Sequence, residues 1–336
     1  IEPYVEYIKL KLSINYNNLD PFTSELAYNA FLIDTLPGST NRYYKLLPPQ
    51  QGMNQSKYLT SSGSMGETGF SFAGNYMNKL YIGGTLGFSK IKYNETSDYR
   101  EYKNESDTAF SLNNFTYNEE LSSRGTGFNF KLGIIYRPTD WIRIGGALHT
   151  PTYYSMSDDY VVSLRSQFDQ NYNYSPSAQS SSFNYSIVTP ARAIASVGFV
   201  IAKKGLINAE YEHIDYRTTR FFPSRDFNGL NSAINNSLQT SSNVKIGAEI
   251  RFDPFVIRGG YAIYGDPYGI KSPFTSLKNF YTGGVGYRTN NWYVDFAFVF
   301  NTFKTNYYLY DPSFVQAAQN KYLNQSLICT IGFRFW

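Results

Sequence analysis

Residues 243–264 read NVKIGAEIRFDPFVIRGGYAIY, and this stretch decides the fold. Its first half alternates strictly, with Val244, Ile246, Ala248, Ile250 and Phe252 opposed to Lys245, Gly247, Glu249 and Arg251. A period of two puts one set of side chains on each face of a β-strand. The segment RFDPF then separates a strand over 240–252 from one over 255–265, and it is short enough for a tight hairpin turn. The stretch therefore predicts two antiparallel strands with one apolar and one polar face.

The same alternation recurs along most of the chain. Strand pairs joined by short turns are predicted at 70–77 and 80–93, 124–137 and 141–156, 185–202 and 206–220, 240–252 and 255–265, and 278–289 and 292–308. The segments 4–16 and 327–335 bring the visible strands to twelve, an even number that is able to close a barrel. Long polar segments such as 94–123 and 165–182 connect one pair to the next. Short turns at one end and long loops at the other are typical of outer-membrane barrels, with the turns periplasmic and the loops extracellular.

The composition leaves two classes of protein open, a soluble all-β protein and a transmembrane antiparallel β-barrel. Only 42% of the residues are hydrophobic and no apolar run is long enough for a membrane-spanning helix, but a barrel needs none because only alternate side chains face lipid. A soluble sandwich distributes its long connections over both ends, so the loop asymmetry favours the barrel. Aromatic residues also flank the short turns, where an interfacial girdle belongs; they are Tyr76, Tyr81, Tyr136, Trp141, Phe252, Phe255, Tyr287, Trp292 and Phe335.

A family resemblance is carried by three stretches, GFSFAGNYMNKLYIGGTLGF (69–88), GTGFNFKLGIIYRPTDWIRIGGALHTPTYY (125–154) and NVKIGAEIRFDPFVIRGGYAIYGDPY (243–268). They resemble the FadL/TodX-type hydrocarbon and fatty-acid transporters of the outer membrane, specifically the branch common in Bacteroidota. The resemblance covers roughly residues 60–336. It implies a fourteen-stranded barrel, so residues 1–336 are expected to form a single barrel from which the family's N-terminal hatch and first two strands are absent.

The polar face of the predicted strands carries charges of both signs. With the apolar face toward lipid, the residues that line the interior are Lys131, Arg143, Glu210, Glu212, Lys245, Glu249, Arg251, Arg258, Arg288, Asp295 and Arg334. Two interpretations remain open. The charges form a network of cross-strand salt bridges that fills and stiffens the barrel, or they form a polar route or a site for a ligand head group. The mixed signs argue against a strongly ion-selective pore.

The segment 20–38, DPFTSELAYNAFLIDTLPG, interrupts the β pattern. Apolar residues at helical spacing, between a start at Asp20-Pro21 and a stop at Pro37-Gly38, predict a helix in an extracellular loop; they are Leu26, Ala27, Ala30, Phe31 and Ile33. The resemblance implies that such a helix helps to form a hydrophobic groove that captures an amphiphile. The alternative is that these side chains pack the loop onto the barrel rim or onto a partner. A second, weaker loop helix is predicted over 311–322.

Glycine pairs recur in the middle of the predicted strands, at Gly83-Gly84, Gly145-Gly146, Gly259-Gly260 and Gly283-Gly284. Glycine weakens a strand and often marks a bend or a close approach of backbones. The pairs either relieve curvature and make room for bulky interior side chains, or they kink a strand and open the wall sideways. The second interpretation is the lateral exit that the resemblance implies.

We expect an outer-membrane channel of a Gram-negative bacterium that takes up hydrophobic or amphipathic molecules, such as long-chain fatty acids, and releases them sideways into the membrane. The expected partners are this ligand and outer-membrane lipids. The alternative is a structural barrel subunit of a secretion or assembly complex, because long Tyr-rich loops suit protein docking. Charges are spread along the chain, so no nucleic-acid partner is expected. His149 and His213 fall on opposite faces, and no catalytic residues, metal site or cofactor are expected.

Overall fold

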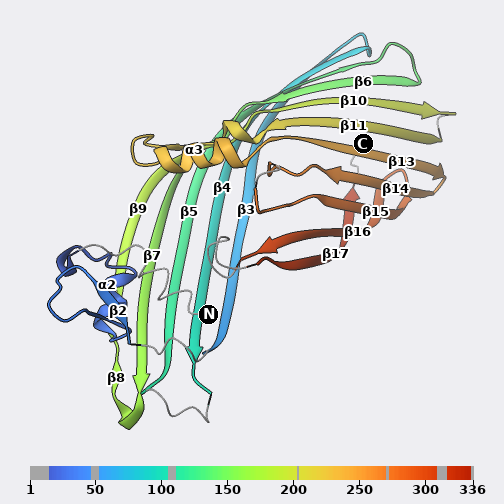
Figure 1. Ribbon diagram of the computed structural model, residues 1–336. Helices are drawn as coiled ribbons and strands as arrows, with labels where there is room; N and C mark the ends of the chain where they lie inside the picture. The colour runs from blue at the N-terminus through green and yellow to red at the C-terminus, as the bar shows by residue number, and fades with distance from the viewer. Residues whose placement is uncertain are drawn as a thin grey trace. The chain divides into compact units, whose positions relative to one another are not determined.

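The computed structural model describes residues 15–46, 53–104, 111–202, 204–269, 272–308 and 316–333. In this part of the chain, one fifteen-stranded antiparallel sheet dominates the fold (Figure 1). The predicted strand over 4–16 lies almost entirely outside the described residues, and so do Arg334 and Phe335. None of the helices in the described part has the length and hydrophobicity needed to span a membrane.

The strands of the sheet are β3 (Asn54–Tyr76), β4 (Leu80–Tyr102), β5 (Leu112–Tyr136), β6 (Ile142–His149), β7 (Tyr153–Phe168), β8 (Asn173–Tyr174), β9 (Gln179–Val188), β10 (Arg192–Ile201), β11 (Gly205–Asp215), β12 (Arg220–Phe222), β13 (Thr240–Phe252), β14 (Phe255–Tyr264), β15 (Lys278–Arg288), β16 (Trp292–Tyr307) and β17 (Ala318–Phe333). Their order is β3-β4-β5-β6-β10-β11-β13-β14-β15-β16-β17. A branch leaves β5 through β7, β9 and β12, with β8 paired to β7.

Smaller elements occupy the connections. They are η1 (Tyr16–Asn18), α2 (Ser24–Asn29), β1 (Ile33–Thr35), β2 (Tyr43–Lys45), η2 (Asp169–Asn171), η3 (Tyr216–Thr218) and α3 (Asn228–Ser237). Strands β1 and β2 pair with each other as a separate two-stranded sheet. The predicted helix over 311–322 is wrong in its described C-terminal part, because residues 318–322 begin strand β17.

Tight turns join neighbouring strands as the sequence predicts. Between β3 and β4, the backbone N–H of Lys79 donates to the carbonyl of Tyr76 at 3.0 Å. Met77 and Asn78 have φ angles of 53° and 54°. Two left-handed residues in succession are the backbone of a type I′ turn, whose twist matches that of the flanking strands. Chain direction therefore reverses here without splaying the sheet.

Two predicted strands are each broken by a proline. The predicted strand 141–156 contains all of β6 and the start of β7 with Pro151 between them, and the predicted strand 185–202 contains the end of β9 and all of β10 with Pro190 between them. Proline has no N–H to donate and interrupts a central strand. The two breaks meet, since Thr189 donates its N–H to the carbonyl of Thr152 at 3.1 Å. This is where the sheet branches.

Strands also extend far into segments that were predicted to be polar loops. In the predicted loop 94–123, residues up to Tyr102 belong to β4 and residues from Leu112 onward belong to β5. These segments carry polar residues on both faces, so a search for apolar alternation misses them. Strand β3 starts sixteen residues earlier than predicted, at residue 54 instead of 70.

The chain divides into two compact units, and each is described by itself. Unit 1 contains residues 1–66, 90–125 and 156–184, and unit 2 contains residues 67–89, 126–155 and 185–336. Unit 1 holds the distal ends of β3, β4, β5 and β7 together with α2, β1 and β2. In Figure 1, α2 and β2 lie beside β7.

Unit 1 has a true hydrophobic core. Its fully buried side chains include Leu26, Ala27, Ala30, Leu32, Ile33, Leu112, Phe115, Val162 and Leu164. The hydroxyl of Ser166 on β7 donates to the carbonyl of Ala30 at 2.6 Å, and the hydroxyl of Tyr117 on β5 donates to the carbonyl of Phe22 at 3.0 Å. Residues 20–35 are therefore packed onto the strand ends.

A buried carboxyl lies near the end of β4. Glu101 is the penultimate residue of this 23-residue strand and is 1% exposed. A membrane-spanning strand needs about 9–11 residues, so this end of β4 extends beyond the span that starts at its turn. Gln55 and the Tyr99 hydroxyl donate hydrogen bonds to the carboxylate. Burial raises the pKa of Glu101, although the two hydrogen bonds lower it in part.

We predict that Glu101→Gln changes the pH dependence of stability. Because the folded chain holds this proton more tightly than the unfolded chain, its stabilising effect is fully present below the unfolded pKa of about 4.3 and is lost as pH rises through the raised folded pKa. The amide variant removes that loss. The melting temperature of the variant minus that of wild type should therefore be larger at pH 8 than at pH 4. Thermal unfolding of both proteins at the two pH values measures this difference. An equal difference at the two pH values would contradict the prediction.

Candidate functional site

Unit 2 is a sheet with two chemically different faces. Residues directly opposite each other in an antiparallel pair project their side chains to the same face. The row Leu132, Leu148, Ala193 and His213 follows from the registers of β5, β6, β10 and β11, and the row Ala209, Ile246 and Tyr261 from those of β11, β13 and β14. On this apolar face Leu148 is 61% and Ile246 52% exposed. Exposing so much continuous apolar surface to water is unfavourable, whereas contact with lipid hydrocarbon carries no such cost.

The predicted aromatic girdle lies at the ends of the strands next to the short turns. Tyr76, Trp141, Phe252, Phe255 and Trp292 are all exposed there. Trp141 stacks on Phe199 with ring centroids 6.3 Å apart, and Phe255 contacts Tyr287 at 5.5 Å. Amphipathic rings of this kind are favoured at the boundary between hydrocarbon and water.

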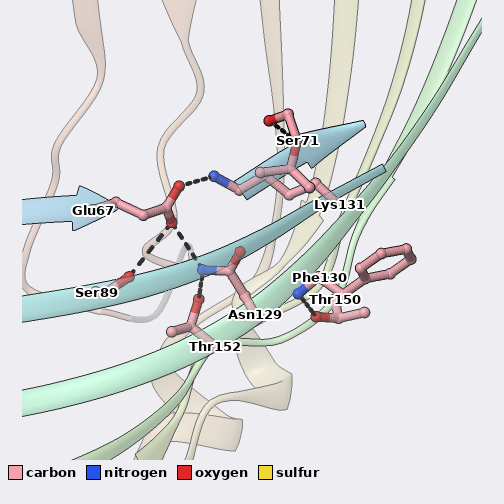
Figure 2. A network of polar contacts seen from close by, with 9 residues as sticks. Glu67, Ser71, Ser89, Asn129, Phe130, Lys131, Thr150 and Thr152 are labelled. Carbon is pink, nitrogen blue, oxygen red and sulfur yellow. Dashed lines mark hydrogen bonds and ion pairs between the residues drawn. The ribbon is translucent and has the colours of Figure 1, made fainter. Parts of the chain in front are cut away.

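The polar face of unit 2 begins with a network on β3, β4 and β5 (Figure 2). Glu67 forms an ion pair with Lys131. It also accepts a hydrogen bond from the Asn129 amide at 2.9 Å and one from the Ser89 hydroxyl at 3.4 Å. The same amide donates to Thr152 at 3.3 Å. Three strands are thus joined through one carboxylate, and the Asn129 amide extends the network to the Pro151 break.

A second cluster lies on β10, β11 and β13. Glu212, which is 3% exposed, accepts from the Asn243 amide at 2.8 Å and pairs with Arg192 at 3.4 Å. Lys245 lies 2.7 Å from Glu210 and 3.8 Å from Glu212. The registers place Lys131, His149 and Arg192 in one row, so this cluster continues the first one across β6.

A third cluster forms a chain of alternating charges on β13 to β16. The order is Arg251, Glu249, Arg258, Asp295 and Arg288, with N–O distances of 2.7, 2.7, 3.2 and 3.2 Å along the chain. Three guanidinium groups face two carboxylates, so the cluster has one excess positive charge. Only 13% of the Asp295 side chain is exposed.

Glycines on β15 make the third cluster possible. Arg258 is on β14 and Asp295 on β16, two strands that are not neighbours. On the intervening strand, Gly284 is opposite Arg258 and Gly286 is opposite Asp295. A Cβ atom at Gly286 would collide with the Asp295 carboxylate. Absence of side chains at these positions therefore lets an ion pair reach across an entire strand.

A recess of about 430 Å³ lies between the second and third clusters. Gly247, Gly260 and Gly284 form part of its floor, and Lys245 and Arg258 lie at its margins. Gly247 is opposite Gly260 in the ladder. A Cβ at Gly247 would lie 2.7 Å from Asn208 Oδ1, so the space depends on glycine. The recess thus presents backbone and small side chains within an otherwise charged face.

The structure brings together most of the predicted interior residues. Ion pairs join Lys131, Glu210, Glu212, Lys245, Glu249, Arg251, Arg258, Arg288 and Asp295 to partners on the same face. Arg143 is exposed and forms no ion pair with a described residue, and Arg334 lies outside the described residues. Sequence reasoning missed Glu67 and Arg192. Glu67 precedes the predicted start of its strand, and Arg192 directly follows the Pro190 break, where the alternation is reset.

The predicted groove in the segment 20–38 needs correction. The helix is only Ser24–Asn29, and Ile33 lies in β1. Leu26, Ala27, Ala30 and Ile33 are at most 2% exposed, so they pack the loop onto the strands and do not line an open groove. Phe31 is different, because it is 46% exposed with a φ of 55° and contacts Tyr174 with ring centroids 4.3 Å apart. Its left-handed backbone ends the helix.

No protein-family model and no curated protein matches the sequence. Among solved structures, a FadL homologue from Pseudomonas aeruginosa is similar with a TM-score of 0.50 and 12% identity, over 82% of this chain and 67% of that chain. The toluene transporter TbuX from Ralstonia pickettii is similar with a TM-score of 0.48 and 16% identity, over 83% and 69% of the two chains. The CymD monoaromatic hydrocarbon channel gives 0.41 and 12%, over 84% and 87%.

The fold class is therefore an antiparallel transmembrane β-barrel. Within that class the chain has the fold of the FadL-type transporters. Two of the solved structures named above are described as a toluene transporter and a monoaromatic hydrocarbon channel.

Proposed function

We propose that this protein is an outer-membrane channel for hydrophobic small molecules. The observation that carries the proposal is the glycine-floored recess on the polar face of a FadL-type fold. Its volume of about 430 Å³ is within the roughly 300–1,000 Å³ of small-molecule sites. The charges at its margins are already paired with one another, so a ligand does not have to neutralise them. An apolar molecule can cover the floor at little electrostatic cost.

Long-chain fatty acids are the ligand class that we favour. The third cluster as a whole has one positive charge more than its carboxylates neutralise, and one of its members, Arg258, adjoins the recess. A fatty acid carries one carboxylate and a long apolar chain. Guanidinium groups bind carboxylates strongly, and each buried methylene contributes about 0.8 kcal/mol. The combination of cationic margin and small-residue floor matches both ends of such a molecule.

We place lateral exit at a glycine patch on β13, β14 and β15. Gly247 is opposite Gly260, and Gly259 is opposite Gly283. The backbone ladder is continuous here, so exit requires a transient separation of strands. Cross-strand side-chain pairs stabilise a sheet by roughly 0.2–1 kcal/mol each, and the patch lacks them. The wall is therefore held at this point mainly by backbone hydrogen bonds.

The test is uptake of a fluorescent long-chain fatty acid by outer-membrane vesicles that contain the protein. Ala297→Phe puts an aromatic ring into the recess, and Ala209→Phe makes the same change on the apolar face as a matched control. We expect uptake by wild type and by the control, and a loss of at least several-fold in the recess variant. Equal uptake by wild type, Ala297→Phe and Ala209→Phe would show that the ligand does not pass through the recess. No uptake by folded wild type, with stable protein partners after purification, would favour the structural subunit instead.

The same assay tests the exit. Gly259→Val with Gly283→Val supplies a cross-strand pair, and both sites have room because an added Cβ meets nothing closer than 4.0 Å. Ligand should still bind but should appear more slowly in the lipid phase. Gly74→Val on β3 is the control, since a Cβ there meets nothing within 4 Å. Unchanged release from the double variant would place the exit elsewhere.

A further inference from the structure

A second hollow lies on the apolar face of unit 2, away from the recess. It has a volume of about 580 Å³ and extends over β5, β6, β10 and β11. The small residues Gly146, Ala193 and Ala195 line its floor, and the larger side chains of Leu132, Leu148 and Tyr211 line its sides. The registers of these strands place all six on the apolar face. The hollow is thus a groove in the surface that would contact hydrocarbon.

One end of this groove carries a group of polar side chains. His213 lines the groove and is exposed. Ser242 is opposite His213 in the ladder, and its hydroxyl is 2.7 Å from that of Tyr211. An imidazole and two hydroxyl groups supply hydrogen-bond donors and acceptors at one place. No charged residue accompanies them in the groove lining.

The height of these groups matches a membrane interface. His213 follows the turn residue Lys204 by nine positions, which is about 30 Å along a strand at roughly 3.3 Å per residue. A tilt of about 40°, typical of outer-membrane strands, reduces this to roughly 23 Å, near the top of an apolar band about 25 Å tall. The exposed aromatic residues beside the short turns mark the opposite boundary. The groove therefore descends from one interface into the hydrocarbon.

We propose that this groove binds one acyl chain of a phosphate-bearing membrane lipid, whose phosphate accepts hydrogen bonds from His213 and from the Tyr211–Ser242 hydroxyl pair. The groove is continuous with the lipid-facing surface, and its polar end lies where head groups are. An amphiphile with one polar end is thus the occupant that matches it. The inference rests on the membrane placement in the proposed function but not on the transport activity.

The test uses the full chain in nanodiscs of phosphatidylethanolamine, followed by transfer into detergent and native mass spectrometry of retained lipid. Ala195→Leu fills the floor, and a Cβ already occupies this site, so the backbone is unaffected. Cys329→Leu adds bulk to an exposed position on β17 as the control. We expect wild type and control to retain one lipid and Ala195→Leu to retain about tenfold less, which corresponds to 1.4 kcal/mol.

A second variant separates the polar end from the groove floor. His213→Leu keeps the surface apolar, so it should lower lipid retention and abolish any preference for phospholipid over a diacylglycerol of equal chain length. Retention that is equal in wild type and Ala195→Leu, in protein that has inserted into nanodiscs, would overturn the groove inference and leave the channel proposal intact. Protein that stays monodisperse in buffer without lipid would overturn the membrane placement itself.

Discussion

Replacing Asp295 with alanine is expected to lower the free energy of unfolding by about 3 kcal/mol, because removing one partner of a buried ion pair leaves the other charge uncompensated. Asp295 joins Arg258 and Arg288 at 3.2 Å each, and its side chain is 13% exposed. The side chains of Arg258 and Arg288 are 34% and 27% exposed. Water therefore solvates the unpaired arginines in part, and we expect the lower end of the roughly 3–5 kcal/mol that breaking a buried ion pair usually costs. Urea unfolding in lipid vesicles, followed by the shift in gel mobility of folded barrels, measures the change.

Asp140→Ala is the matched control for this experiment. Asp140 also pairs with an arginine, at 2.6 Å, but its side chain is 96% exposed, so its loss should cost less than about 1 kcal/mol. Gly286→Val tests the geometric explanation separately. The added side chain displaces the Asp295 carboxylate without altering any charge, and we expect a loss of stability similar to that of Asp295→Ala. Normal stability of both variants would show that the ion pair across β15 contributes nothing.

Replacing Phe115 with alanine is expected to destabilise unit 1 by about 3–5 kcal/mol, the usual cost of deleting a buried aromatic ring. Phe115 is 0% exposed and contacts Tyr99 with ring centroids 6.1 Å apart. It lies in the same core as Leu26 and Leu164, which holds the segment 20–35 on the strands. The lost ring leaves a cavity that packed neighbours cannot fill completely.

Hydrogen–deuterium exchange measured by mass spectrometry localises this effect. Peptides covering residues 24–35, 112–120 and 160–168 should exchange faster in Phe115→Ala. Phe128→Ala removes the same ring from the apolar face of β5, where Phe128 is 58% exposed, and should leave those peptides unchanged. Unaltered exchange in Phe115→Ala would mean that the loop is not held by this core.

Much of unit 2 could be predicted from the sequence because its strands obey one rule. Where a strand has one apolar and one polar face, alternation and a short turn fix its limits, and the predicted 240–252 is identical to β13. The rule fails where a strand is polar on both faces, as in the distal parts of β4 and β5. It also fails at Pro151 and Pro190, because alternation continues across a break in hydrogen bonding that only the proline reveals.

The partners of the polar residues could be predicted only in part. Cross-strand neighbours such as Glu210 and Lys245 follow from a correct register, and alternation places both on the polar face. The contact between Arg258 and Asp295 skips a strand and depends on two residues without side chains, so it follows only from the three-dimensional arrangement. The function of residues 26–33 could not be predicted from the sequence. A periodic apolar pattern is the same for a ligand groove and for a packed core, and the structure shows a packed core.

The glycine positions on β15 have a consequence for the evolution of this barrel. Positions 258 and 295 are expected to change together among related chains, although a whole strand separates them. Such a correlation, taken as evidence of neighbouring strands, would wrongly indicate that β14 pairs directly with β16. A small side chain at position 286 is the sign that distinguishes the two cases, since a true neighbour pair has no need of it.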